Sequence, residues 1–181
     1  MNSTMQKQFH DLAAKDKQVQ YEAYQNILKG TEQEVDWAYD VWDQLKEDLA
    51  HSDPHHRSRA AQFLANLAIS DPENRMLRDF PELWKVTKDE KFVTARHSLQ
   101  AIWKVGLAGS EQKEIVITHL VDRFRNCDNE KNYTLIRADI IQGLRNLYDV
   151  LEDEAIKQIA MKLIETVEDK KYYKKYKHIW K

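Results

Sequence analysis

The sequence predicts an all-α protein, an α-α superhelix (solenoid) of about five helix pairs forming a single domain over residues 1–181. Three observations carry this prediction. Only 4 of the 181 residues are glycine and 3 are proline, while 32% are charged, which favours long helices with short joints. No segment alternates between apolar and polar residues, so strands are not expected. One helical pattern recurs at steps of about 40 residues.

The recurring pattern begins with an arginine, which small or apolar residues follow at positions three, seven and ten. Its three copies are Arg57 with Ala60, Leu64 and Leu67, Arg96 with Leu99, Trp103 and Gly106, and Arg137 with Ile140, Leu144 and Leu147. This spacing places the three following residues on one face of an α-helix. The arginines are 39 (96 − 57) and 41 (137 − 96) residues apart, a step typical of stacked helix pairs that bury one another's apolar faces.

The first two helices are expected over residues 4–15 and 17–28. In the second, Gln20 occupies the slot of the arginine, 37 residues before Arg57 (57 − 20). A terminal pair has no upstream neighbour, so an atypical residue in this slot fits a first repeat. Gly30 follows as a C-cap.

The third helix is expected over residues 34–50, where apolar side chains recur on one helical face. Thr31 with Glu34 three positions later resembles a capping box, which predicts the start of this helix. Its apolar stripe consists of Val35, Ala38, Trp42, Leu45 and Leu49.

Proline-containing joints predict the starts of the next two helices, over residues 54–70 and 74–86. Asp53-Pro54 supplies an N-cap and a proline at the first helical position, where its missing N–H costs nothing. Asp71-Pro72 repeats this signal. Pro81 predicts a kink or a split inside the 74–86 helix, because proline cannot donate the helical hydrogen bond.

Polar and glycine-containing joints separate the helices of the second half. The Arg96 helix is expected over residues 91–105 and stops near 106–109, and the next helix starts at Ser110. Residues 126–132 form a polar connection, after which the Arg137 helix runs to about Tyr148.

The last pair is expected over residues 152–167 and 169–180. Tyr173 lies 36 residues after Arg137 (173 − 137), so the final helix takes the second position of a closing pair. Its sequence is rich in lysine and tyrosine. We expect it to cap the end of the stack, with its aromatic side chains inward and its lysines in solvent. A surface of lysines and aromatics is also able to bind nucleic acid.

The amino-acid composition limits the partners and the cellular setting that we expect. The formal net charge is −2, so no overall basic field points to nucleic acid or a membrane surface. The only cysteine, Cys127, cannot form an internal disulfide and suits a reducing compartment. No secretory signal and no membrane-spanning run is recognised, so we expect a cytoplasmic protein without membrane contact.

The Arg57 segment after Asp53-Pro54 resembles the second helix of a HEAT repeat, a member of the armadillo-type folds. Arg96 and Arg137 match the same arginine position, although the acidic residue of the joint lies at a different distance in each unit. The resemblance implies a scaffold or adaptor that binds proteins, peptides or nucleic acid on its concave face. It also implies that the three arginines are structural, tying joints together through backbone carbonyls and an acid.

The expected binding residues lie on second helices, off the apolar stripe, where solenoids present their binding surface. They are Arg59, Lys104, Gln142 and Arg145. From these observations we expect a non-catalytic scaffold that binds a protein or peptide on its concave face. The oligomeric state is open.

An enzymatic alternative comes from residues 36–43, which mix aspartates with aromatics. HEAT-like DNA-alkylation-repair glycosylases hold damaged nucleotides with such side chains, so the alternative is a nucleic-acid-binding relative of that group, degenerate in its pocket. Against it, the stretch is acidic and repels phosphate, and Trp42 lies in the apolar stripe. We expect no catalytic residue, no metal site and no cofactor. His51, His55 and His56 are interpreted as joint histidines, and Cys127 lacks a partner base.

Overall fold

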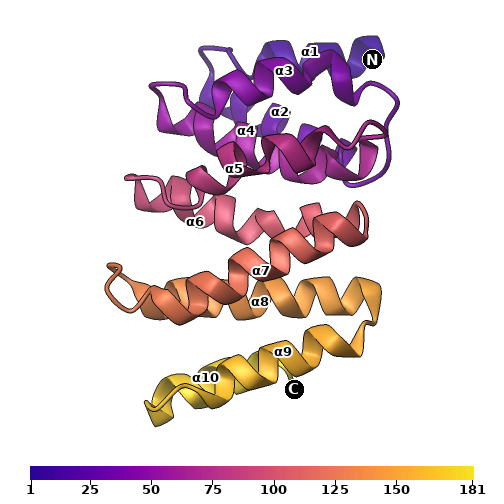
Figure 1. The fold of residues 1–181 in the computed structure, drawn as a ribbon. Coiled ribbons are helices and arrows are strands. Elements are labelled where there is room, and N and C mark those ends of the chain that lie inside the picture. The colour runs from indigo at the N-terminus through magenta and orange to yellow at the C-terminus, as the bar shows by residue number, and fades with distance from the viewer.

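The computed structural model describes residues 1–181 as ten α-helices and two short 3₁₀-helices, without strands, so the all-α prediction is confirmed (Figure 1). In chain order the elements are α1 (Ser3–Asp11), α2 (Lys17–Gly30), α3 (Ala38–Asp48), α4 (Pro54–Leu67), η1 (Ala68–Ser70), α5 (Arg75–Val86), α6 (Phe92–Ala101), η2 (Ile102–Leu107), α7 (Ser110–Asn126), α8 (Tyr133–Leu151), α9 (Glu154–Glu165) and α10 (Lys170–Ile179).

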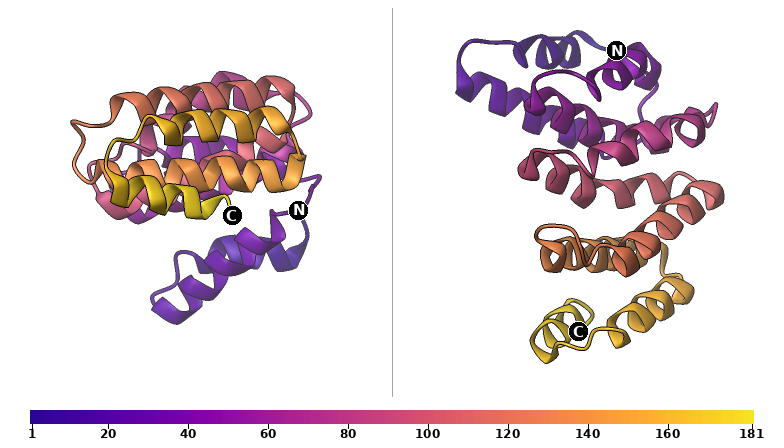
Figure 2. Two further views of the ribbon diagram at one scale, coloured as in Figure 1. Left: turned by 90° about the horizontal axis from the view of Figure 1, so that it is seen from below. Right: turned by 60° about the vertical axis from the view of Figure 1, so that its left-hand side comes forward.

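The helices pack as consecutive pairs in two layers. Each odd-numbered helix contacts the even-numbered helix that follows it. Helices α3, α5, α7 and α9 succeed one another along one layer, which we call the first layer. Helices α2, α4, α6, α8 and α10 form the second layer, and Figure 2 shows both layers edge-on at the C-terminal end. The two chain ends lie at opposite ends of the stack.

A single apolar core runs the length of the stack. Buried apolar side chains form one continuous cluster that extends from Ile27 in α2 to Tyr176 in α10. The pattern residues Leu64 and Leu144 are 2% and 0% exposed, so this face of each arginine-led helix points inward as predicted. Trp103 is partly buried against the same cluster.

Most predicted helix boundaries lie within a few residues of the observed ones, but the predicted start of α3 is wrong. Thr31 is not an N-cap: its hydroxyl donates backward to the carbonyl of Ile27 at 2.8 Å and thereby closes α2. The chain then runs irregularly to Trp37, and α3 begins at Ala38. The capping box predicted for Thr31 and Glu34 therefore does not form.

The two proline signals differ in outcome. Asp53 caps α4 through the backbone N–H of His55, with Pro54 at the first position, as predicted. Pro72 does not start α5, because the helix begins only at Arg75. Asp71 nevertheless caps it across this gap by accepting from the N–H groups of Arg75 and Met76 at 2.9 and 2.8 Å. Of the kink or split predicted at Pro81, the split does not occur, because helix α5 continues through this residue.

Candidate functional site

Arg57 ties two joints together. Its guanidinium donates to both carboxylate oxygens of Asp89, at 2.6 and 2.9 Å, and to the carbonyls of His51 and Ser52, at 2.8 and 3.1 Å. The carbonyls belong to the α3–α4 joint and Asp89 to the α5–α6 joint. The two side chains are 13% and 7% exposed, so the pair is almost completely buried. The hydrogen bonds from Arg57 hold the pKa of Asp89 below its usual value, against the effect of burial.

Arg96 and Arg137 occupy the same helical position but have other partners. Arg96 pairs with Asp139 of α8 at 2.9 Å and remains 38% exposed, so it joins two helices and caps no joint. Arg137 donates to the carbonyl of Phe124 at 3.0 Å and lies over the ring of that residue at 4.9 Å, with no acid bound. Each of the three arginines makes structural contacts, but only Arg57 combines joint carbonyls with an acid.

Arg123, in the first layer, makes a tie that the sequence pattern missed. This arginine of α7 is 4% exposed and donates to the carbonyl and hydroxyl of Thr87 at 2.8 and 3.0 Å. It also pairs with both oxygens of Glu130 at 3.1 and 3.2 Å. Thr87 closes α5 and Glu130 lies in the α7–α8 joint, so Arg123 connects these two joints as Arg57 connects the pair before them.

Of the expected binding residues, Arg59 and Lys104 line different cavities. Arg59 lies beside Phe9 and His56 in a cavity of about 350 Å³ between α1, α3 and α4, and donates to the carbonyl of Leu12 at 3.2 Å. Lys104 lies in a cavity of about 360 Å³ at the other end of the second-layer helices. Burial lowers the pKa of Lys104, and the charge of Glu32 opposes this shift.

The other two expected binding residues lie on α8. The amide of Gln142 is exposed and donates to Asn146 at 2.8 Å. Arg145 pairs with Asp149 at 2.7 Å, donates to the carbonyl of Ile179 at 3.3 Å and lies over the ring of Trp180 at 5.6 Å. Arg145 therefore holds α10 to α8. The four residues are distributed along the second layer, and the structure does not gather them into one site.

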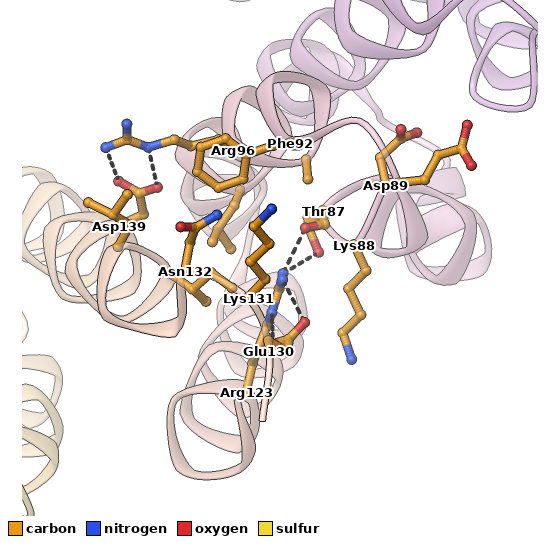
Figure 3. Close-up of a pocket in the computed structure, with 15 residues that line it drawn as sticks. Thr87, Lys88, Asp89, Phe92, Arg96, Arg123, Glu130, Lys131, Asn132 and Asp139 are labelled. Atoms are coloured by element: carbon orange, nitrogen blue, oxygen red, sulfur yellow. Dashed lines mark hydrogen bonds and ion pairs between the residues drawn. The ribbon is translucent and has the colours of Figure 1, made fainter. Parts of the chain in front are cut away.

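A pocket lies where the α5–α6 joint faces the α7–α8 joint, and we call it the joint pocket (Figure 3). Its cavity measures about 450 Å³. Apolar side chains of α6 and α8 line one part of it: Phe92, Ala95, Leu99, Leu135 and Ile136. Charged side chains from the two joints and from α6, α7 and α8 line the rest.

Charges of both signs surround the joint pocket. Figure 3 shows Arg96 bound to Asp139, and Arg123 bound to Glu130 and Thr87, so these groups are already neutralised. Three further charged side chains of the lining form no ion pair, namely Lys88, Glu90 and Lys131. The pocket therefore offers apolar surface bordered by two lysines and one glutamate that are free to bind a ligand.

Phe92 and Val93, in the first turn of α6, are exposed at this place. Phe92 lines the joint pocket and is 42% exposed, and Val93 beside it is 63% exposed. No sequence pattern predicts this site, because its two joints are about 40 residues apart in the chain and each is polar by itself. Only the stacking of α6 on α8 brings them together.

The remaining sequence candidates have structural surroundings. Trp37 and Trp42 are 8% and 0% exposed, and the indole N–H of Trp42 donates to Asp79 at 3.0 Å. The rings of His51 and His56 stack with centroids 4.1 Å apart. No three His, Cys, Asp or Glu side chains converge as metal ligands. Burial raises the pKa of the Cys127 thiol, which is 1% exposed.

Comparisons with known proteins add no relationship: no protein-family model and no curated protein matches the chain. None of the helices combines the length and the apolar character that a bilayer crossing requires.

Proposed function

We propose that the protein is a non-catalytic scaffold, a HEAT-type α-α solenoid that binds a protein partner through an extended peptide segment. The stacking of five helix pairs in two layers supports the solenoid part of this proposal. The joint ties of Arg57 support it further, because they match the role that the HEAT resemblance implies for the arginine. A cytoplasmic setting is part of the proposal, since the only cysteine leaves no internal disulfide to form.

One observation carries the binding proposal: Phe92 is left 42% exposed in a pocket whose lining is partly apolar. An aromatic side chain of this size contributes most of its free energy when it is removed from water. A partner that inserts an apolar side chain between Phe92 and Leu135 completes this burial. Apolar anchors seated in pockets supply most of the affinity at protein interfaces.

The free charges define the flanks of the segment. Lys88 and Lys131 form no ion pair and attract carboxylates, while Glu90 attracts a basic residue. We therefore expect a peptide with an aromatic or aliphatic anchor and charged residues of both signs on either side. Opposite charges at the rim select the partner and its orientation more than they add affinity.

The structure offers no support for the repair-enzyme alternative in residues 36–43. Holding a base requires an open aromatic face, and Trp37 and Trp42 are packed into the core.

Selection from a random peptide library tests the proposal. We expect the wild-type protein to enrich peptides with one apolar anchor flanked by charged residues. Binding of the selected peptides, measured by calorimetry, is expected to fall at least about tenfold in Phe92→Asp, because an anchor contact of this kind is worth about 1.4 kcal/mol or more.

The matched control is Val150→Asp, which places the same charge on a 57% exposed apolar residue near the end of α8. The control is expected to bind as the wild type does. The proposal fails if no peptide is enriched, or if the selected peptides bind Phe92→Asp as tightly as they bind the control.

A further inference from the structure

Helix α10 closes the stack with one face buried and the other free. Tyr176 is 1% exposed and donates to the carbonyl of Thr134 in α8 at 2.8 Å. Tyr172, Ile179 and Trp180 pack against the same core. Because these residues share one side of the helix, the opposite side of α10 has no neighbour in the molecule.

Lysines occupy that free side in a regular row. Lys170, Lys174 and Lys177 follow one another at steps of four and three residues, which keeps them on one face of α10. Lys181 comes four residues later, just beyond the end of the helix at Ile179. At about 1.5 Å per residue, the helical part of the row, from Lys170 to Lys177, is about 10 Å long. All four lysines are exposed, and none forms an ion pair. A second row, Lys171 and Lys175 with His178, runs beside the first and is also exposed.

This row contrasts with the charge of the remaining chain. Residues 170–181 contain six lysines and no acid. The other 22 of the 28 basic residues stand against all 30 acidic ones, so residues 1–169 carry a net charge of −8. A polyanion is therefore attracted to one end of the molecule and repelled by the rest, which orients its approach.

The packing of the α10 side chains limits which kind of polyanion can bind this helix. Its large apolar side chains are turned into the core, so it lacks the free apolar face that anchors an amphipathic helix in a bilayer. Tyr176 is buried, and Tyr172, Tyr173 and Trp180 are partly buried against the core, so α10 presents no fully exposed ring on which the bases of a single strand could stack.

An acidic protein surface is the weaker fit as well. Exposed ion pairs contribute little each, and α10 adds no apolar contact to support them. A nucleic acid duplex differs because its dense charge holds condensed counterions, whose release makes several lysine contacts favourable. We propose that the lysine row from Lys170 in α10 to Lys181 just after it binds the phosphate backbone of double-stranded nucleic acid, without sequence preference.

Fluorescence anisotropy with labelled 20-base-pair DNA duplexes of two unrelated sequences tests this proposal. The wild-type protein is expected to bind both duplexes equally. Four phosphate contacts predict a slope of about −3.6 for log K against log salt concentration, so raising the salt from 50 to 200 mM weakens binding about 150-fold.

Two variants with equal net charge locate the site. The first replaces Lys170, Lys174, Lys177 and Lys181 by Gln, and the second replaces the exposed Lys15, Lys29, Lys85 and Lys162 by Gln. We expect the first variant to lose at least about 30-fold in affinity at 50 mM salt, and the second to stay within about threefold of the wild type. Both are expected to keep the wild-type melting temperature, since the substituted side chains are exposed.

Three results would overturn the proposal. One is the absence of wild-type binding to duplex DNA at 20 mM salt, and another is an equal loss in both variants. The third is binding to polyglutamate, or to vesicles with phosphatidylserine, that is as tight as binding to the duplex and depends on the same four lysines. That outcome would assign α10 to an acidic protein or to a membrane surface.

Discussion

The same arginine position has different consequences in the two halves of the stack. In the N-terminal half, Arg57 and Asp89 are both nearly buried, and the arginine also caps two carbonyls of a joint. In the C-terminal half, Arg96 forms an ion pair with Asp139, but the Arg96 side chain is 38% exposed and binds no carbonyl. The comparison teaches that the repeat pattern sets the position of the arginine in its helix. Which groups the arginine binds depends on the neighbouring joint.

Arg57→Ala is expected to have the largest effect of the variants that test this comparison. It leaves the carboxylate of Asp89 without its main partner in a site that is 7% exposed. Removal of one member of a buried pair destabilises by about 3 kcal/mol or more, which chemical denaturation measures. Arg57→Lys keeps the charge and is expected to lose less. An unchanged midpoint for Arg57→Ala would contradict the role assigned to this tie.

Arg123→Ala extends the comparison to the first layer. Its guanidinium is the least exposed of these arginines, and its loss frees the carbonyl of Thr87 and the carboxylate of Glu130. Glu130 is 35% exposed and regains water, so we expect a destabilisation of about 2 to 3 kcal/mol, slightly below that of Arg57→Ala. Thermal melting compared with the exposed variant Arg125→Ala checks this order.

The carboxylate of Asp79, between α3 and α5, makes a contribution to stability that depends on pH. Burial by itself raises the pKa of this carboxyl, but hydrogen bonds from Arg78, Lys46 and Trp42 outweigh it and hold the pKa at about 2. Because the pKa of Asp79 in the folded protein lies below the ordinary value of 3.8, its contribution to stability is complete above about pH 4 and is lost as the pH falls toward 2. We expect about 2 kcal/mol of stability to disappear across this window.

Denaturation curves of the wild type and of Asp79→Asn, recorded between pH 5 and pH 2, check this prediction. Asp79→Asn is expected to be less stable near pH 5 and to approach the wild type toward pH 2. Parallel loss of stability in the two proteins would show that other carboxylates cause the acid sensitivity.

Arg96→Ala is expected to have the smallest effect, about 1 kcal/mol or less, because the side chain is 38% exposed and its pair is partly screened by water. Gln100 also continues to donate to Asp139 at 3.2 Å after the arginine is removed. Chemical denaturation beside Arg57→Ala measures the difference. Equal losses would mean that solvent exposure does not separate the two pairs.

Local signals explain which elements were predictable. Helical periodicity located every helix, because each buries one apolar face. The start of α3 was missed because the hydroxyl of Thr31 can close the preceding helix as well as open the next one. The start of α5 was displaced because Asn74 adopts a left-handed conformation (φ 53°), which lets Asp71 cap the helix from a distance.

The candidate site was less predictable than the fold, for a physical reason. Arg123 meets Thr87 across 36 residues, and no short-range pattern records such a contact. The joint pocket likewise depends on how closely α6 and α8 stack, since Phe92 and Leu135 become neighbours of one cavity only then. By contrast, the lysine row is visible in the sequence, because Lys170, Lys174 and Lys177 share one face of α10.

Paired double-mutant cycles test the central claim most directly. The cycles combine Arg57→Ala with Asp89→Ala, and Arg96→Ala with Asp139→Ala, and use chemical denaturation to obtain the coupling free energies. We predict a coupling of about 2 kcal/mol or more for the first pair, in which both side chains are nearly buried, and below about 1 kcal/mol for the second pair, whose arginine is 38% exposed. Equal coupling energies, or a larger one for Arg96 and Asp139, would contradict the account.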